Sequence, residues 1–160
     1  MKSLKLIAML LVVATVACST TTPLLQPVKV VGIAMEPALH EGDRIFVNRN
    51  PAEFSRGDIV LFYYPHDPRV SYIKRVIGLP GETITIREGK VQINGTPLSE
   101  PYVDPKNNQS IAGNEEKSIP AESYFVMGDN RDNSSDSRTW GTLARKLIYA
   151  KFVGKYYSSE

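Results

Sequence analysis

The chain has 160 residues, 42% hydrophobic and 22% charged, a composition that supports a folded domain and excludes a largely disordered chain, a coiled coil and a collagen-like repeat. Its 19 Lys and Arg residues nearly balance 17 Asp and Glu residues, so the net charge of +2 gives no electrostatic basis for nucleic-acid binding. A single cysteine and two histidines exclude an intrachain disulfide and a multi-cysteine or histidine-rich metal cage.

Residues 1–18 are typical of an export signal. Lys2 and Lys5 precede an apolar run over 6–17 that only Thr15 interrupts, which is the order of a basic region and a hydrophobic region in such signals. At about 1.5 Å per residue the run is about 18 Å long, short of the roughly 30 Å hydrocarbon core of a bilayer. We therefore expect an export signal in place of a conventional transmembrane helix.

Cys18 follows small residues and precedes a polar stretch at 19–22, an arrangement that resembles the lipoprotein signal of bacteria. The resemblance implies that Cys18 becomes the lipidated first residue of the mature protein. The alternative is a plain signal in which Cys18 is incidental. A lone cysteine exported into an oxidising space needs a reason, which favours lipidation. We expect a linker over 19–27 and a folded domain over 28–160.

From residue 28 onward, short β-type runs between turn signals predict an all-β fold with little helix. The expected strands are 28–35, 44–47, 58–64, 72–77, 83–87, 90–94, 123–127 and 148–156. The runs 83–87 and 90–94 alternate with period two around Glu88-Gly89, which predicts a hairpin. One helical turn is expected within 142–147, and the polar, proline-containing stretch 99–121 is expected to be a long surface loop. Short strands at this spacing indicate a barrel or a sandwich.

Two features of the sequence each allow two interpretations when they are considered alone. Lys74 lies in an otherwise apolar strand, where it is either an edge-strand lysine that points to water or a desolvated lysine that acts as a base. Lowering the pKa of a lysine by about three units costs about 4 kcal/mol, so the residues alone favour the first interpretation. The stretch 127–141 is rich in Asp, Asn, Ser and Arg and is either a solvated loop or a buried ionic cluster.

Four ordered segments together resemble the motifs of type I signal peptidases, the membrane-associated serine proteases that remove export signals with a Ser–Lys dyad. The segments are 32–43, 56–60, 72–82 and 127–141. The resemblance extends from residue 28 to the end of the chain and implies a signal-peptidase-like β-barrel or sandwich. Larger members of the family insert a second β domain between the last two motifs. The short stretch found there in this chain implies a minimal catalytic core.

The resemblance also implies roles for individual residues. Lys74 falls at the position of the general base, and Ser134 at the position of the hydroxyl that orients the lysine nitrogen. The implied ionic network that braces the site consists of Asp129, Arg131, Asp136 and Arg138. The residues implied to lie against the substrate are Gly32, Met35, Pro37, Tyr72, Met127 and Gly128.

The nucleophile position holds Ala34, which has no oxygen to attack a carbonyl, so no acyl-enzyme can form there. Removing the nucleophile of a serine protease costs about a million-fold in kcat. Ala34 is either an introduced change that traps a working enzyme or the natural residue of an inactive homologue. The retention of Lys74 and Ser134 favours the first explanation or a recent loss.

The sequence therefore predicts the scaffold of a signal peptidase I-type serine endopeptidase, which removes N-terminal signal peptides from exported preproteins but is inactive with Ala34. The alternative is a non-catalytic, membrane-attached lipoprotein that binds preproteins or pilin-like subunits. The implied partners are signal peptides and the membrane surface, with no nucleic acid, metal or cofactor. We expect a monomer on the extracytoplasmic face of the membrane, with a lipid on Cys18 as its candidate anchor.

Overall fold

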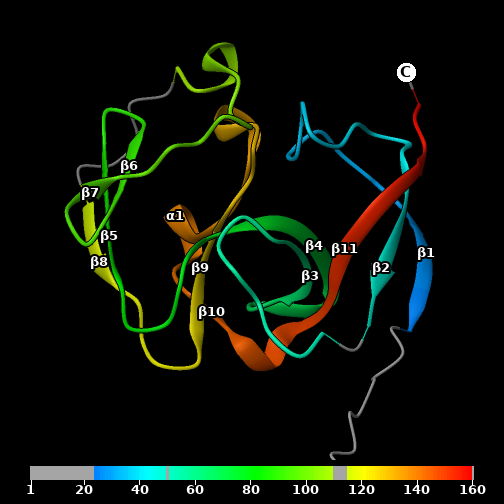
Figure 1. Cartoon of the computed structure of the whole chain (residues 1–160), viewed down its shortest axis with the longest axis horizontal. Helices are drawn as coiled ribbons and strands as arrows, with labels where there is room; N and C mark the ends of the chain where they lie inside the picture. Colours follow the sequence, from blue (N-terminus) through cyan, green and yellow to red (C-terminus); the bar gives the residue numbers. More distant parts are fainter. Residues whose placement is uncertain (1–23, 50, 110–114, 160) are drawn as a thin grey trace, which may run out of the picture.

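The computed structural model describes residues 24–49, 51–109 and 115–159. Within these ranges the chain folds into two antiparallel β-sheets joined by turns and short helical segments. Figure 1 shows the larger sheet, with β11 and β2, apart from the smaller sheet, with β5 to β8. The prediction of an all-β fold with little helix is confirmed. Cys18 and the predicted export signal 1–18 lie outside the described residues.

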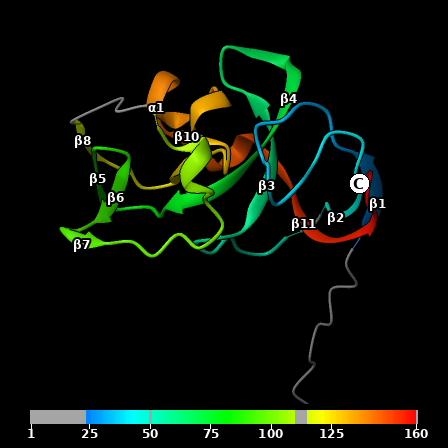
Figure 2. The same cartoon turned by 90° about the horizontal axis from the view of Figure 1, so that it is seen from above.

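The larger sheet has the strand order β1-β2-β11-β3-β4-β9-β10. Its strands are β1 (Leu25–Lys29), β2 (Arg44–Asn48), β3 (Ile59–Tyr64), β4 (Asp67–Gly78), β9 (Ser123–Met127), β10 (Leu143–Ala144) and β11 (Ile148–Tyr157). Strand β4 is central, because it pairs with β3 on one side and β9 on the other. The β3–β4 hairpin projects from the body of the molecule in the view of Figure 2.

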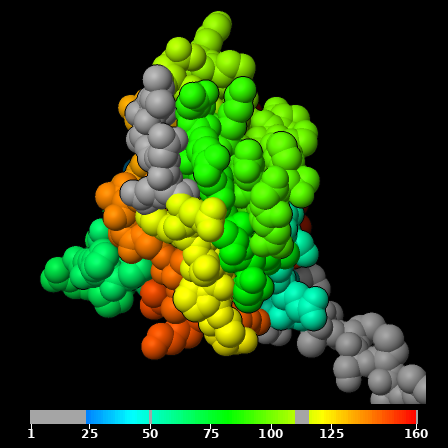
Figure 3. Space-filling model, turned by 90° about the vertical axis from the view of Figure 1, so that its left-hand side faces the viewer, coloured from blue at the N-terminus to red at the C-terminus, as the bar shows by residue number. Residues whose placement is uncertain are grey.

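The smaller sheet has the order β7-β6-β5-β8 and is inserted in the chain between β4 and β9. Its strands are β5 (Thr83–Arg87), β6 (Lys90–Ile93), β7 (Thr96–Pro97) and β8 (Glu115–Ser118). The predicted hairpin is confirmed: Arg87 pairs with Lys90, and the positive φ angles of Glu88 (49°) and Gly89 (72°) suit a tight two-residue turn. Figure 3 shows this side of the molecule, where green residues of the hairpin lie next to the yellow segment of β8 and β9.

The helical segments are short. They are η1 (Pro105–Asn107), η2 (Arg131–Asn133), α1 (Ser137–Trp140) and η3 (Arg145–Leu147). The helical turn expected within 142–147 is confirmed for η3, although it is preceded by the two-residue strand β10. In the described part of the chain, no helix has the length and apolar character needed to cross a bilayer.

Three predictions of local structure are wrong. The expected strand 28–35 ends at Lys29, because the chain turns at Gly32 (φ 83°) and the N–H of Leu39 bonds to the carbonyl of Met35. Strand β1 begins at Leu25, so residues 25–27 of the expected linker 19–27 form a strand, whereas residues 19–23 lie outside the described residues. The stretch 99–121 is not a plain surface loop, since it contains η1 and β8. Strand β8 was missed because its sequence is polar and it pairs only at the sheet edge with β5.

The expectation of a minimal catalytic core also needs correction, since the short insert is a folded unit. Ile84 and Ile93 of the β5–β6 hairpin pack in one cluster with Phe125 and Met127 of the larger sheet. A second cluster lies under β1, β2 and β11 and holds Met35, which is 1% exposed. Packing therefore joins the two sheets and fixes the turn that carries Ala34.

Candidate functional site

Lys74 lies in the middle of β4, opposite Val60 of β3, and is 4% exposed. The interpretation of Lys74 as an edge lysine pointing to water is therefore wrong. Burial lowers the pKa of Lys74 from 10.5 to about 8, although the negative charge of Asp136 opposes the shift. The Lys74 ammonium also lies over the Tyr72 ring, 5.2 Å from its centroid.

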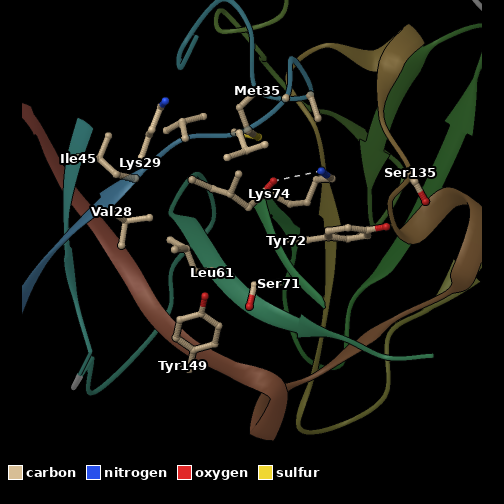
Figure 4. Close-up of a pocket in the computed structure, with 15 residues that line it drawn as sticks. Val28, Lys29, Met35, Ile45, Leu61, Ser71, Tyr72, Lys74, Ser135 and Tyr149 are labelled. Atoms are coloured by element: carbon tan, nitrogen blue, oxygen red, sulfur yellow. Dashed lines mark hydrogen bonds between the residues drawn. The ribbon is translucent and has the colours of Figure 1, made fainter. Parts of the chain in front are cut away.

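A pocket of about 350 Å³ opens beside Lys74. Ala34 and Lys74 both line it, so the structure brings the two residues of the implied dyad to one cavity. Figure 4 shows Lys74 and other lining residues of this pocket. The remaining lining residues are Val28, Lys29, Val30, Val31, Gly32, Met35, Ile45, Leu61, Ser71, Tyr72, Ile73, Ser135 and Tyr149. The pocket is thus mostly apolar with a few polar groups, as small-molecule and peptide sites commonly are.

The turn that carries Ala34 is held against the segment after β9. The backbone N–H of Asn130 donates to the Ala34 carbonyl at 3.1 Å, and Asn130 Nδ2 donates to the Ile33 carbonyl at 3.3 Å. A Cβ atom at Gly128 would lie 2.5 Å from the Ala34 carbonyl oxygen and 2.6 Å from Cβ of Ser134. Only glycine leaves room for this approach, which brings Ala34, Gly128 and Ser134 together.

Ser134 lies near this junction, but its hydrogen bonding differs from the expectation. Its hydroxyl is buried and has no hydrogen-bond partner among the described residues. The Lys74 amine instead donates to the carbonyl of Ile73 at 3.1 Å. The implied hydrogen bond between Ser134 and Lys74 is therefore not formed in this structure, and the orienting role of Ser134 stays a prediction.

Asp136 also holds Gly128 in place, through a hydrogen bond from the Gly128 backbone. Its side chain is fully buried, accepts from the Gly128 N–H at 3.0 Å and binds the guanidinium of Arg138 with two bonds of 2.8 Å. Arg138 also donates to the Arg131 carbonyl at 2.7 Å. The stretch 127–141 thus contains a buried ionic cluster, and the interpretation as a wholly solvated loop is wrong, although Asp132, Asn133, Ser135 and Thr139 are exposed.

Two further ion pairs complete this network. Asp129 is fully buried and binds Arg75 of β4 through bonds of 2.8 and 2.5 Å. Arg131, 2% exposed, donates to the Gly128 carbonyl at 3.0 Å and to Glu100 at 3.1 and 2.5 Å. Arg75 and Glu100 were not identified as site residues from the sequence. Arg75 adjoins Lys74 in an apolar strand, which is a detectable signal, whereas Glu100 lies in a polar stretch with none.

The residues implied to contact substrate divide into two groups. Gly32, Met35 and Tyr72 line the pocket. Pro37 is exposed on the turn and does not line it, and Met127 is buried in the cluster that joins the two sheets. Gly128 lies behind Ala34, against its carbonyl oxygen. Of the six residues expected to contact substrate, only Gly32, Met35 and Tyr72 are therefore placed to touch a peptide in the pocket.

Comparisons with known proteins agree with this geometry. Residues 3–157 match the family model described as signal peptidase, peptidase S26. The chain is 39% identical to a signal peptidase I of Bacillus licheniformis over 78% of this chain and 73% of that protein, and 40% identical to signal peptidase I T of Bacillus subtilis over 81% and 74%. A crystal structure of a signal peptidase I from Enterococcus faecalis superposes with a TM-score of 0.55 at 33% identity, covering 65% of this chain and all of that one. This chain therefore belongs to the signal peptidase family, peptidase S26.

Proposed function

We propose that this chain binds the N-terminal signal peptides of exported preproteins in the pocket beside Lys74 and that Ala34 prevents it from cutting them. The observation that carries the proposal is the shared pocket, in which a buried amine and the Ala34 side chain line the same cavity. The family of the chain supports the class of substrate. A methyl group at position 34 removes the attacking atom and leaves the rest of the cavity in place.

The walls of the pocket suit an extended peptide. Residues 28–32 form one wall at the end of β1, and Ser71–Lys74 of β4 form another. A peptide lying between them could pair its main chain with these strands, as in β-strand addition. Apolar side chains such as Ile45 and Leu61 line the cavity, and the resemblance to the family implies small residues one and three positions before the cut.

With serine at position 34, the mechanism would follow from the same geometry. Neutral Lys74 would accept the serine proton while the serine oxygen attacks the scissile carbonyl, and backbone N–H groups near position 34 would bind the oxyanion. Lys74 would return the proton to the leaving amine and then activate the water that hydrolyses the ester. With a pKa of about 8, roughly a tenth of Lys74 is neutral at pH 7, which is enough for a general base.

The test is cleavage of a purified preprotein by the chain as written and by its Ala34→Ser variant. We expect no detectable product from the first and signal-peptide removal by the second, a difference on the order of a million-fold. Cleavage by the chain with Ala34, at a rate that a Lys74→Met change does not abolish, would contradict the assignment of the pocket.

A second function is favoured by Ala34 itself, namely a non-catalytic lipoprotein that holds preproteins or pilin-like subunits. Without a hydroxyl at position 34, the buried amine of Lys74 adds a desolvation cost and no catalysis. The same variant separates the two functions. Signal-peptide binding that persists while Ala34→Ser stays inactive would support the non-catalytic function and overturn the trapped-enzyme interpretation.

We further propose that the chain acts on the extracytoplasmic face of the membrane as a monomer, with a lipid on Cys18 as its anchor. A single acyl chain gives only weak, reversible attachment, so contacts of the folded domain with the membrane surface would add to it. The Cys18→Ser variant should then appear in the soluble fraction of lysed cells. Retention in the membrane fraction together with an unprocessed N-terminus would instead indicate that the signal segment itself stays as the anchor.

A further inference from the structure

Two hydroxyl groups lie at the end of the pocket away from Lys74. Ser71 comes from β4 and Tyr149 from β11, and both line the cavity. Figure 4 shows them together at that end, below Leu61, whereas the Lys74 amine lies at the other end. Among the described residues, neither side-chain hydroxyl has a hydrogen-bond partner.

Tyr149 is held in place by its neighbours. Its ring lies 4.7 Å from the ring of Tyr63, centroid to centroid, and 5.1 Å from the guanidinium of Arg49. Ser71 is opposite the same Tyr63 in the β3–β4 pairing. Both hydroxyls are therefore attached to paired strands, so a ligand would lose little entropy in ordering them.

The spacing along β4 relates these hydroxyls to a position in a bound peptide. Ser71 and Lys74 are three residues apart, about 10 Å at roughly 3.3 Å per strand residue. An extended peptide with its scissile carbonyl beside Lys74 would place its third residue before the cut two residues upstream, about 7 Å away, and the side chain of that residue would cover the remaining distance. Because side chains alternate, the first and third residues before the cut would face the same wall.

We infer that the Ser71 and Tyr149 hydroxyls select a hydroxyl-bearing side chain, Thr or Ser, at the third residue before the cut. The inference rests on the proposed function, since it specifies the substrate of the same pocket. An apolar side chain at that position would cover both hydroxyls and leave them without water or partner, whereas a substrate hydroxyl replaces the lost water. One such hydrogen bond corresponds to about a three- to tenfold difference in Kd.

The experiment uses the chain as it stands, because Ala34 allows binding of an intact peptide to be measured at equilibrium. Two fluorescent signal peptides differ only in Thr or Val at the third residue before the cut, a pair of nearly equal shape that differs in the hydroxyl. We expect the Thr peptide to bind about three- to tenfold more tightly. In Ser71→Ala and Tyr149→Phe the ratio should fall toward one.

Matched controls are Ser99→Ala in the exposed stretch before η1 and Tyr156→Phe, an exposed tyrosine on β11 outside the pocket. These should keep the ratio of the unaltered chain. The ratio is taken between two peptides on one protein sample, so partial misfolding of a variant lowers both binding signals equally.

The outcomes are distinguishable. Equal affinities for the two peptides, with both well above a scrambled peptide, would overturn the hydroxyl selection and leave the proposed function intact. A preference for Thr that survives both pocket variants would also overturn it, since the selectivity would arise elsewhere. Failure of either peptide to bind better than the scrambled one would overturn the proposed function, and the selection with it.

Discussion

The smaller sheet and the region around Lys74 adjoin each other, yet they are stabilised in different ways. The β5–β6 hairpin contributes aliphatic side chains to the interior, among them Ile84, Ile86 and Val91. The region around Lys74 buries charged groups such as Asp129 and Asp136, both fully buried. Each of these two carboxylates is bound by an arginine with two hydrogen bonds.

The difference indicates where a single substitution should have a large effect. Aliphatic packing loses free energy gradually as atoms are removed. A buried charge is tolerated only while its partner remains, so removing one partner has a cost out of proportion to the few atoms changed. The site is therefore the sensitive part of the molecule and the smaller sheet the tolerant part.

The largest effect is expected on catalysis, in the Ala34→Ser background. Adding Lys74→Met should abolish the restored cleavage, a loss of about a million-fold, because the other lysine lining the pocket, Lys29, is exposed and lacks the burial that favours a neutral amine. Product formation is measured with a preprotein. The matched control is Lys90→Met, an exposed lysine of β6, which should leave the rate unchanged. Equal losses in both variants would place the base elsewhere.

The next effect concerns the ion pair between the insert and the site. Glu100→Gln removes the counter-charge of Arg131, which is 2% exposed, and should lower the free energy of unfolding by about 3 to 5 kcal/mol. Urea unfolding measures it. Glu53→Gln, at an exposed position, should change stability by less than about 0.5 kcal/mol. If both variants unfold at the same urea concentration, the ion-paired region is not more sensitive to substitution than an exposed position, which contradicts the argument above.

A somewhat smaller effect depends on pH. The folded pKa of Lys74 is lowered from 10.5 to about 8, so between these values the unfolded chain binds more protons than the folded chain. The free energy of unfolding should therefore rise from pH 8 to pH 10.5, by about 3 kcal/mol from this group. Lys74→Met should lack this contribution. If the stability of the two proteins changes in the same way with pH over that range, the pKa of Lys74 is not lowered in the folded chain.

The smallest effect is expected in the smaller sheet. Ile84→Val removes one buried methylene from the joining cluster and should cost about 1 kcal/mol of stability. Signal-peptide affinity should stay the same, because Ile84 does not line the pocket. Thermal unfolding and the fluorescent-peptide assay measure the two quantities. A loss of affinity would mean that the smaller sheet controls the site more directly than its packing indicates.

Much of the fold was predictable because local pattern and final environment coincide. Residues 83–87 and 90–94 alternate around Glu88-Gly89, and the hairpin needs only that alternation and a turn with positive φ. Strand β8 was missed because its polar residues carry no such alternation. The turn after β1 was mistaken for strand because residues 28–35 are apolar, although Met35 is buried from a turn.

For the site, the chemical groups could be read from the residues alone: an amine at Lys74, a methyl group at Ala34, and the acids and arginines of 127–141. The burial of Lys74 between β3 and β9, and the pairing of Glu100 of the insert with Arg131, became visible in the folded chain. Desolvation and charge pairing depend on residues distant in the chain, so the local sequence does not reveal them. Neither the burial of an amine nor its pKa is a property of its own strand.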